Sequence, residues 1–366
     1  MSVAVAHINR IGTANPPHKV HKAFVDFVAS TIADEKQRRL FGRMVDRAGI
    51  GQRYSFLEPV TLPDGTITDA DGFYGTGDWP PTSKRMARYE RDAPALALAA
   101  IRKLDPDIAN SGITHIVVAS CTGFMAPGLD QVIIERAGLD PSIERTVVGF
   151  MGCYAAVNSL RLAHHIVRST PDARVLVVTL ELCTLHFQRT DDLERLLSML
   201  LFGDGAAAAL VTAESEGIAL RDFRAMTIGD TADAITWSIG DQGFDMHLGG
   251  EVPARIAEAL RQEQGGDRPD GLLRGQSPDR FAHWAVHAGG RTILDAVEQG
   301  LGLAAESLAP SRAVLHDHGN MSSATLMFIL AYMLRRRQTG GPAQLGIAMA
   351  FGPGMAAETF RFELLA

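Results

Sequence analysis

Two stretches of the sequence match each other in the order and character of their segments. The first runs from HIVVAS through a helix-like segment to TVVGFMGCYAAVNSLRLAHHIV, and the second from HWAVH through ILDAVEQGLGL to AVLHDHGNMSSATLMFILAYML. Ser120 lies 33 residues before Cys153, and His287 lies 33 residues before Asn320. A repeated strand–helix unit predicts two similar halves packed in layers. The repeat loses its symmetry at its polar positions, so we expect a site built from Cys153, His287 and Asn320.

The length of the chain also predicts two halves. At 366 residues it exceeds the size at which one hydrophobic core stops growing, so we expect two fused units of roughly 150 to 200 residues each. We place them at 1–215 and 216–366, because mixed polar segments begin near residue 215. Hydrophobic residues at 46% and charged residues at 21% indicate a globular protein. A net charge of −7 argues against general nucleic-acid binding, which needs a basic face.

Targeting segments and metal motifs are not evident in the sequence. The N-terminus lacks a cationic start followed by a long apolar run, and no window reaches the roughly 18 to 20 apolar residues of a membrane span. We expect a soluble, cytoplasmic protein. Cys121, Cys153 and Cys183 are too few for a disulfide framework and lack CxxC spacing, so the sequence indicates neither a secreted scaffold nor a zinc site. His316 and His318 have no third ligand nearby in sequence, so we expect no metal there either.

Apolar and polar segments alternate in a way that predicts the α/β class. Residues 20–48 have a helical pattern, 56–95 form a turn-rich cap region, and 89–103 have the pattern of an apolar helix. Continuous apolar runs typical of buried strands occupy 113–120, 174–182 and 206–213. The C-terminal segment predicts two strands joined by a Gly-Pro-Gly turn, because Pro353 cannot continue a ladder. We therefore expect stacked layers of helices and sheet.

Cys153 stands where the strand-like TVVGF gives way to the helix YAAVNSLRLAHHIV. Backbone N–H groups point outward at a helix start and the helix dipole is positive there, which favours a thiolate. A neighbouring imidazolium at such a position lowers a cysteine pKa from about 8.5 to roughly 3.5–7.5. We therefore predict that Cys153 is the nucleophile, and that Cys121 and Cys183 are buried, unreactive thiols.

His287 and Asn320 have the chemistry to assist that nucleophile. His287 ends an apolar run and enters AGG, as at the carboxyl end of a strand that opens on a cleft. Its imidazole can pair with the thiol or donate to a developing oxyanion. Asn320 is expected between an apolar strand and the helix TLMFILAYML, with Gly319 allowing a close backbone approach. A plain helix cap is the alternative for Asn320, but its equivalence to Cys153 in the repeat favours a catalytic amide donor.

This set of residues suits a decarboxylative Claisen condensation. Loss of CO₂ itself generates the carbon nucleophile, so no carboxylate base is required and the enzyme has only to stabilise an enolate oxygen. We assign that task to His287 and Asn320. The acyl group that the enolate attacks is held on Cys153 as a covalent intermediate.

Motifs along most of the chain resemble the type III polyketide synthases, the chalcone-synthase-like branch of the thiolase superfamily. They are GCYAAVNSLRLA, ELCTLHF, LFGDGAAA, VHAGGRTILDAVEQGLGL, HGNMSSA and the closing FGPG, which contains Gly352, Pro353 and Gly354. The resemblance implies a duplicated, five-layered αβαβα thiolase-like fold and a homodimer. It also implies an acyl-CoA starter, malonyl-CoA as extender and no bound cofactor.

The resemblance also assigns residues that bind the substrates. Phe202 matches the family's gatekeeper phenylalanine, and Met246 falls at the second gatekeeper position, where plant members carry phenylalanine. Ala126 stands near the position from which plant enzymes insert a methionine into the neighbouring subunit's cavity, and Cys183 is placed beside the cavity. These small or adaptable side chains predict a tunnel past the site and a medium or long fatty acyl-CoA starter, giving alkylpyrones or alkylresorcinols. 

Two arginines are assigned to the coenzyme, and other activities are weighed against this one. Arg43 and Arg47 match the cationic positions that hold the phosphates of CoA.

The nearest alternative is a 3-ketoacyl-ACP synthase III-like enzyme, which shares the Cys-His-Asn set but makes a single condensation on an acyl carrier protein. HGNMSSA and FGPG favour the polyketide synthase. A hydrolase remains a further alternative, because a thiolate attacks thioesters and peptides alike.

Overall fold

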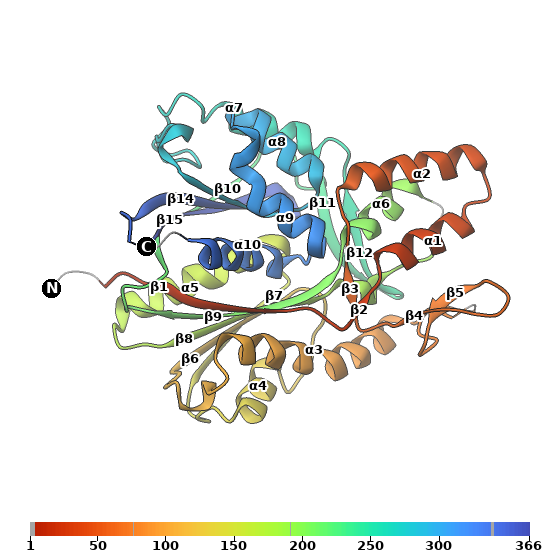
Figure 1. Ribbon diagram of the computed structural model, residues 1–366, viewed down its shortest axis with the longest axis horizontal. Helices are drawn as coiled ribbons and strands as arrows, with labels where there is room; N and C mark the ends of the chain where they lie inside the picture. Colours follow the sequence, from red (N-terminus) through yellow and green to blue (C-terminus); the bar gives the residue numbers. More distant parts are fainter. Residues whose placement is uncertain (1–3, 76, 191, 338–339) are drawn as a thin grey trace.

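The computed structural model describes residues 4–75, 77–190, 192–337 and 340–366 (Figure 1). The strands are β1 (His7–Ala14), β2 (His18–Lys19), β3 (Tyr54–Ser55), β4 (Pro59–Thr61), β5 (Ile67–Asp69), β6 (His115–Ser120), β7 (Glu144–Gly149), β8 (Val175–Leu182), β9 (Asp204–Thr212), β10 (Ile218–Thr227), β11 (Ile235–Gly240), β12 (Gly243–Leu248), β13 (His283–Val286), β14 (Gln344–Gly352) and β15 (Ala356–Leu364). The α-helices are α1 (His21–Thr31), α2 (Glu35–Ala48), α3 (Thr82–Leu104), α4 (Leu129–Ala137), α5 (Ala155–Ser169), α6 (Leu193–Leu201), α7 (Val252–Arg261), α8 (Arg291–Leu301), α9 (Ala309–His318) and α10 (Ser323–Arg336).

The main sheet repeats one strand pattern in the two halves of the chain. Within the described residues, nine strands are hydrogen-bonded in the order β13-β14-β15-β10-β1-β9-β8-β6-β7. In the first half β6 is parallel to β7 and β8, while β8 and β1 run antiparallel to β9. In the second half β13 is parallel to β14, while β14 and β10 run antiparallel to β15. The strand β13 therefore occupies the place of β6, as the sequence repeat predicted.

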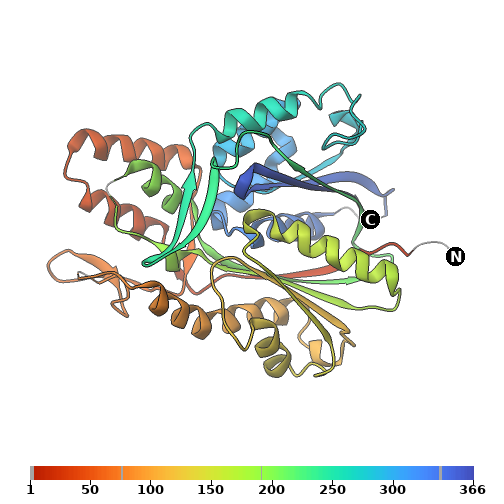
Figure 2. The ribbon, with the colours of Figure 1, turned by 180° about the vertical axis from the view of Figure 1, so that it is seen from behind.

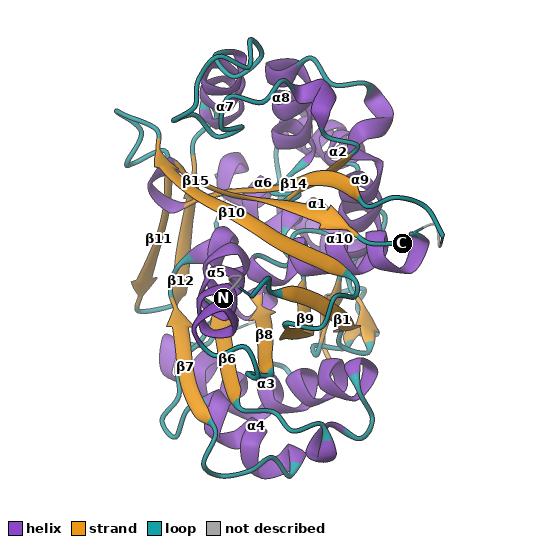
Figure 3. Cartoon of the chain, turned by 90° about the vertical axis from the view of Figure 1, so that its left-hand side faces the viewer, coloured by secondary structure: helices purple, strands orange, loops and turns teal. Residues whose placement is uncertain are grey.

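The two half-sheets are stacked on either side of a central helical layer. They are joined only along β1 and β10, where His7 pairs with Ala219 and Ile8 with Ile218 in the described part of the sheet. The central helices α5 and α10 lie between the half-sheets (Figures 2 and 3), and their apolar side chains share one core with the inner faces of both. Helices α3 and α4 cover the outer face of the first half-sheet, and α7 and α8 that of the second (Figure 1). This is the five-layered αβαβα arrangement that we expected.

The predicted strands and the C-terminal turn are confirmed, and two expectations need correction. The strand expected just before Asn320 is a helix, α9, in which Ser311, Val314 and Leu315 are buried at helical spacing and Pro310 stands in the first turn. A proline at that place suits a helix start, whereas the equivalent TVVG segment forms the edge strand β7. The helix expected from residue 89 begins earlier, at Thr82, and contains Pro94.

A cap of short elements extends beyond the sheets at the end opposite the two chain termini (Figure 1). It contains α1, α2 and the β4–β5 hairpin, from the region that the sequence predicted to be helical and then rich in turns, together with α6 from later in the chain. No helix in the described ranges is long and apolar enough to cross a membrane. The cap and the ends of the half-sheets enclose the candidate site.

Candidate active site

The backbone just after β7 directs Cys153 toward the closing FGPG segment. Phe150 and Gly152 have positive φ angles of 58° and 71°, which turn the chain sharply into the start of α5. A Cβ atom added at Gly152 would lie 2.6 Å from Cδ of Pro353, so glycine is needed for this approach. Cys153 follows in a short 3₁₀ turn, Gly152–Tyr154, and is buried. The predicted placement of Cys153 between a strand and a helix is confirmed.

The ionisation of Cys153 differs from the sequence expectation. Burial raises the pKa of the thiol to about 11, while hydrogen bonds with Ser322 and Asn320 act in the opposite direction. The expected low pKa relied on a neighbouring imidazolium, but burial lowers the pKa of His287 to about 3, so this imidazole is neutral near pH 7. Burial also raises the pKa values of the Cys121 and Cys183 thiols well above their usual range. The resting form of Cys153 is therefore the protonated thiol.

His287 follows β13 directly and has an unusual environment for a buried imidazole. It is 1% exposed, and neither ring nitrogen has a hydrogen-bond partner among the described residues. Buried polar atoms in folded proteins are normally paired, so a side chain left in this state is suited to bind a ligand. A neutral imidazole offers one donor and one acceptor nitrogen, and can thus accept a thiol proton or donate to an oxyanion.

Asn320 lies between α9 and α10 with its amide held in one orientation. Its Oδ1 accepts hydrogen bonds from the Ser322 backbone N–H at 2.8 Å and from the Thr325 hydroxyl at 3.5 Å. Its Nδ2 donates to the carbonyl of Gly289 at 3.1 Å. A Cβ atom added at Gly289 would lie 3.8 Å from Cδ2 of His287, so His287 and Asn320 flank the same glycine. The amide nitrogen is thus the donor end of Asn320, and this side chain acts to lower the pKa of the Cys153 thiol.

A buried arginine that sequence reasoning missed holds the other side of Asn320. Arg53 is fully buried, and its Nη1 donates to the carbonyls of Met199 and Phe202 at 2.8 and 2.6 Å. Its Nε donates to His21 Nδ1 at 3.0 Å, and burial lowers its pKa to about 9. Phe202 forms an isolated parallel bridge with Asn320. Arg53 thus fixes the end of α6 against the segment that carries the amide.

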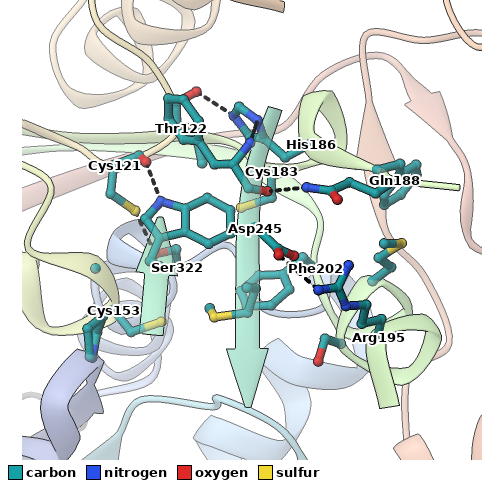
Figure 4. A pocket seen from close by; sticks show the side chains of 18 residues that line it. Cys121, Thr122, Cys153, Cys183, His186, Gln188, Arg195, Phe202, Asp245 and Ser322 are labelled. Carbon is teal, nitrogen blue, oxygen red and sulfur yellow. Dashed lines mark hydrogen bonds and ion pairs between the residues drawn. The ribbon is translucent and has the colours of Figure 1, made fainter. Parts of the chain in front are cut away.

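An apolar pocket reaches Cys153 (Figure 4). Five of the residues predicted from the sequence line it: Cys153, Cys183, Phe202, Met246 and Pro353. His287 and Asn320 are not part of its lining and are almost fully buried. Cys153 therefore lines the pocket, while His287 and Asn320 lie outside its lining.

Sequence comparisons agree with this architecture. The model of the chalcone and stilbene synthase N-terminal domain matches residues 2–215, and that of the C-terminal domain matches residues 222–365. The chain belongs to the chalcone and stilbene synthase family of type III polyketide synthases. It is 34% identical to bisdemethoxycurcumin synthase of rice, over 97% of this chain and 91% of the rice protein. It is 31% identical to an alpha-pyrone synthesis polyketide synthase-like protein of Mycobacterium tuberculosis, over 99% and 92% of the two chains.

Solved structures show the same fold. The polyketide synthase PKS-I of the brown alga Ectocarpus siliculosus has a TM-score of 0.87 and 29% identity, with full coverage of both chains. The type III polyketide synthase domain of Steely1 from Dictyostelium has a TM-score of 0.85 at 24% identity, covering 99% of this chain and all of that domain, and shares the fold. The chain is thus a polyketide synthase, and members of this family use CoA thioesters as substrates.

Other residues predicted for this polyketide synthase lie outside the pocket lining. Ala126 is exposed in the loop before α4. Arg43 and Arg47 are exposed on α2, at the outer side of the cap. Gly352 and Gly354 flank Pro353 without lining the pocket themselves. Their roles remain predictions from the family resemblance.

Aromatic side chains that the sequence did not reveal form another wall of the pocket. Trp237 donates from Nε1 to the carbonyl of Cys121 at 2.8 Å. The His186 ring is stacked on Phe244 at 4.2 Å, and its Nδ1 accepts the Phe244 backbone N–H at 3.0 Å. His186 and Phe244 come from segments 58 residues apart, and Trp237 pairs with Met246 in the β11–β12 ribbon. The contacts among these three rings depend on how the β11–β12 ribbon packs against the segment that carries His186. No local pattern in the sequence indicates that packing.

The buried carboxyl group of Glu181 links this wall to the start of α10. It accepts hydrogen bonds from the Cys121 backbone N–H at 3.0 Å, the Thr122 hydroxyl at 2.7 Å and the Ser323 hydroxyl. Burial raises its pKa. The Cys121 sulfur also lies 3.3 Å from the Ser322 hydroxyl. Ser322, which supports Cys153, is thereby positioned by contacts from both halves.

Among the described residues, no group of His, Cys, Asp or Glu side chains is placed to hold a metal ion.

Proposed function

We propose that this polyketide synthase performs decarboxylative Claisen condensation of malonyl-CoA onto an acyl group carried by Cys153. The observations that support the proposal are a buried thiol at an apolar pocket, a buried imidazole whose two nitrogens have no hydrogen-bond partner among the described residues, and an amide of fixed orientation. Each of the three side chains has the chemistry for a different part of the reaction. Malonyl-CoA and the acyl-CoA starter are the expected substrates, and no bound cofactor is required.

In the first step the acyl group moves from CoA to Cys153. Neutral His287 accepts the thiol proton, and the sulfur attacks the thioester carbonyl of the starter. The bond from that carbonyl carbon to the CoA sulfur then breaks, and CoA leaves as a thiol after it regains the proton. The high pKa of Cys153 means that proton removal has to accompany the attack, which a neutral base permits and an imidazolium does not.

In the second step the extender loses CO₂ and forms the new carbon–carbon bond. The bond between the α-carbon and the carboxylate of malonyl-CoA breaks, and its electron pair is delocalised into an enolate. His287 and the Asn320 amide donate hydrogen bonds to the enolate oxygen. The α-carbon attacks the acyl carbonyl on Cys153, and the carbon–sulfur bond breaks to release the thiolate. The product is a CoA thioester extended by two carbons.

For the starter we infer a medium or long fatty acyl-CoA, giving alkylpyrone or alkylresorcinol products. The pocket lining near Cys153 supports this choice, because Met246 and Met199 are flexible and apolar and Phe202 adds further apolar surface. Each buried methylene contributes about 0.8 kcal/mol, so a twelve-carbon chain is strongly preferred over a two-carbon chain where the space continues.

We infer further that the protein forms a homodimer through the open edge of β7. This strand ends the nine-stranded sheet, and Val147 on it is 56% exposed. Phe124, from the loop that also holds Ala126, is 47% exposed and lies 3.5 Å from a Cβ built at Gly149. An exposed, apolar sheet edge is normally covered, and pairing with a second copy would cover it and bring the two Ala126 loops near the interface.

The experiment that tests the reaction is product analysis by mass spectrometry. The purified protein is incubated with malonyl-CoA and with acetyl-, hexanoyl-, dodecanoyl-, palmitoyl- or p-coumaroyl-CoA, and Cys153→Ala is the control. We expect chain-extended products and the highest kcat/KM with the longer acyl-CoAs. A preference for p-coumaroyl-CoA, or for malonyl-CoA alone, contradicts the fatty starter. One condensation delivered by an acyl carrier protein indicates the synthase III-like alternative, and thioester hydrolysis without malonyl-CoA consumption indicates a hydrolase.

A further inference from the structure

A second pocket lies at the C-terminal half of α5, near the N-terminal segment and away from the cap (Figures 1 and 2). It has a volume of about 460 Å³, which is within the range of natural sites for small ligands. Its walls come from α5, β10, the residues Ala4 and Val5, and the loop that holds Arg274. Its described lining has no residue in common with that of the pocket at Cys153. A ligand bound here would therefore not occupy the active site.

This second pocket is rich in side chains that can carry positive charge, and we call it the basic pocket. The residues that define it are Arg161, His164, His165, Arg168, Arg221 and Arg274. The four on α5 recur at i, i+3, i+4 and i+7, which places them on one face of the helix. Asp222 is the only acidic residue of the described lining, and it already pairs with Arg361 of β15. The basic pocket is thus cationic, although the whole chain has a net charge of −7.

Two arginines of the basic pocket have charges that no carboxylate offsets by contact. Arg161 and Arg221 each form an ion pair with a glutamate of β15. Arg168 and Arg274, in contrast, form no ion pair with any described residue. The Arg274 guanidinium donates to the backbone carbonyl of Phe223, which carries no net charge. Both guanidinium groups are therefore available to an anion, and arginine binds phosphate and carboxylate groups through strong charge-assisted hydrogen bonds.

His164 is a buried polar side chain of the basic pocket that lacks a protein partner. It lines the pocket at 8% exposure, and its Nδ1 has no hydrogen-bond partner among the described residues. Buried polar atoms in folded proteins are normally paired. Burial lowers the pKa of His164 to about 4, and the charges of Arg168 and His165 act in the same direction. The neutral imidazole has one N–H to donate, and a bound anion would offset the repulsion among the surrounding cations.

An apolar wall stands beside these cationic groups. The Phe223 ring lies with its centroid 5.2 Å from that of His164, and the Arg161 guanidinium carbon is 5.6 Å from the same centroid. Val5 and Leu220 line the basic pocket as well. A lone phosphate ion would contact few of these apolar groups and would leave most of the volume to water. The terminal oxygens of a phosphate group match the several donors, and the apolar wall suits an organic group attached to it.

We propose that the basic pocket binds a small phosphate ester, with its phosphate group at Arg168, Arg274 and His164 and its organic group against Phe223. Helix α5 belongs to the first half of the chain and Arg274 to the second, so the ligand would contact both halves. A ligand that binds only the folded chain stabilises it as the free concentration exceeds Kd. The inference does not depend on the reaction proposed for Cys153, and its test uses no condensation assay.

The first test measures binding of phenyl phosphate to the whole chain by isothermal titration calorimetry. The buffer contains chloride at constant ionic strength, and inorganic phosphate and phenol are the comparison ligands. We expect a Kd on the order of 1 mM or tighter for phenyl phosphate, weaker binding of inorganic phosphate, and no binding of phenol at the same concentrations. Failure of both phosphate compounds to bind would overturn the site. Equal affinity for the two would overturn the assignment of an ester.

Three variants establish whether the phosphate group is bound in the basic pocket. Arg168→Gln removes a charge from the last turn of α5, and Arg102→Gln removes one from the last turn of α3, outside the pocket, as the matched control. His164→Phe removes both ring nitrogens and keeps a ring against Phe223.

We expect the Kd for phenyl phosphate to rise at least tenfold in Arg168→Gln and at least threefold in His164→Phe, because each variant loses a donor. The Kd should stay within twofold of the wild-type value in Arg102→Gln. Circular dichroism establishes that each variant is folded, and phenyl phosphate should raise the melting temperature of the wild type but not that of Arg168→Gln. Unchanged affinity in Arg168→Gln and His164→Phe, or an equal loss in Arg102→Gln, would overturn the proposal.

Discussion

Replacing Asn320 by aspartate separates a catalytic amide from a helix cap. Aspartate has the shape of asparagine and can still accept the Ser322 N–H and the Thr325 hydroxyl, so the start of α10 is preserved. The nitrogen, however, becomes an oxygen that faces the carbonyl of Gly289, at the 3.1 Å separation now bridged by a hydrogen bond. The variant loses its donor and places a like charge beside the developing enolate.

The expected loss of rate follows from that missing donor. Removal of one preorganised donor to an oxyanion costs about 10²–10³ in rate, or roughly 2.7–4 kcal/mol of transition-state stabilisation. Loss of the bond to Gly289 in a buried site should lower the free energy of unfolding by about 1–3 kcal/mol, which a folded enzyme tolerates. If Asn320 were only a cap, aspartate would serve equally well, since both residues are favoured at that position.

The assay follows two partial reactions of Asn320→Asp. Release of CO₂ from malonyl-CoA is measured at saturating substrate, and acylation of Cys153 by the starter is followed by intact-protein mass spectrometry. We expect CO₂ release to fall at least 100-fold while Cys153 is still acylated. Circular dichroism and a melting curve establish that the variant is folded. CO₂ release within threefold of the wild-type rate would refute the assignment of Asn320 to the enolate oxygen.

Further outcomes are expected for the thiol, the buried histidines, the sheet edge and the buried arginine. Iodoacetamide should modify Cys153 before the other two cysteines, and faster as pH rises toward its pKa of about 11; faster labelling of another thiol, detected by peptide mapping, argues against it as the nucleophile. Burial lowers the pKa values of His186 and His287 to about 3, so below pH 6.5 the unfolded chain takes up protons that the folded chain does not. Stability to urea should therefore fall as pH drops from about 6.5 to 4.5, by up to about 1.4 kcal/mol per histidine per pH unit, and a flat profile would contradict this. Val147→Asp should shift the protein to monomers in analytical ultracentrifugation, whereas an unchanged mass means that β7 is not the interface. Arg53→Met should lower kcat for condensation at least tenfold by releasing the end of α6, and wild-type kcat in a folded variant would show that Arg53 does not position the site.

Much of the fold could be predicted because the repeated strands are buried, and buried strands leave recognisable apolar runs in the sequence. Strands such as β8 and β9 are buried on both faces, so their apolar runs are unbroken and easy to recognise. The equivalence of β6 and β13 was predicted because Ser120 and Cys153 have the same separation in the sequence as His287 and Asn320. The strand predicted before Asn320 was wrong because the apolar run in AVLHDH is too short for its periodicity to distinguish a helix from a strand. Strand β1 was missed because polar residues interrupt HINRIGTA, although Ile8 is fully buried.

The candidate site was only partly accessible to sequence reasoning. Cys153 and His287 stand at the ends of recognisable strands, so topology alone gives their placement. The ionisation of Cys153 could not be read in the same way, since it depends on how completely the pocket wall excludes water. Arg53 resembles any surface arginine in sequence, and its role arises from three partners that lie far along the chain. Long-range contacts of this kind leave no local pattern.

The central layer of α5 and α10 has a consequence for how the enzyme is assembled. Each half contributes one of these helices, and each half-sheet buries its inner face partly against the helix of the other half. Neither half made alone could cover that face, and neither contains both Cys153 and Asn320. During refolding, activity should therefore not recover before the two halves have associated, because the shared core and the candidate site both need residues from each half.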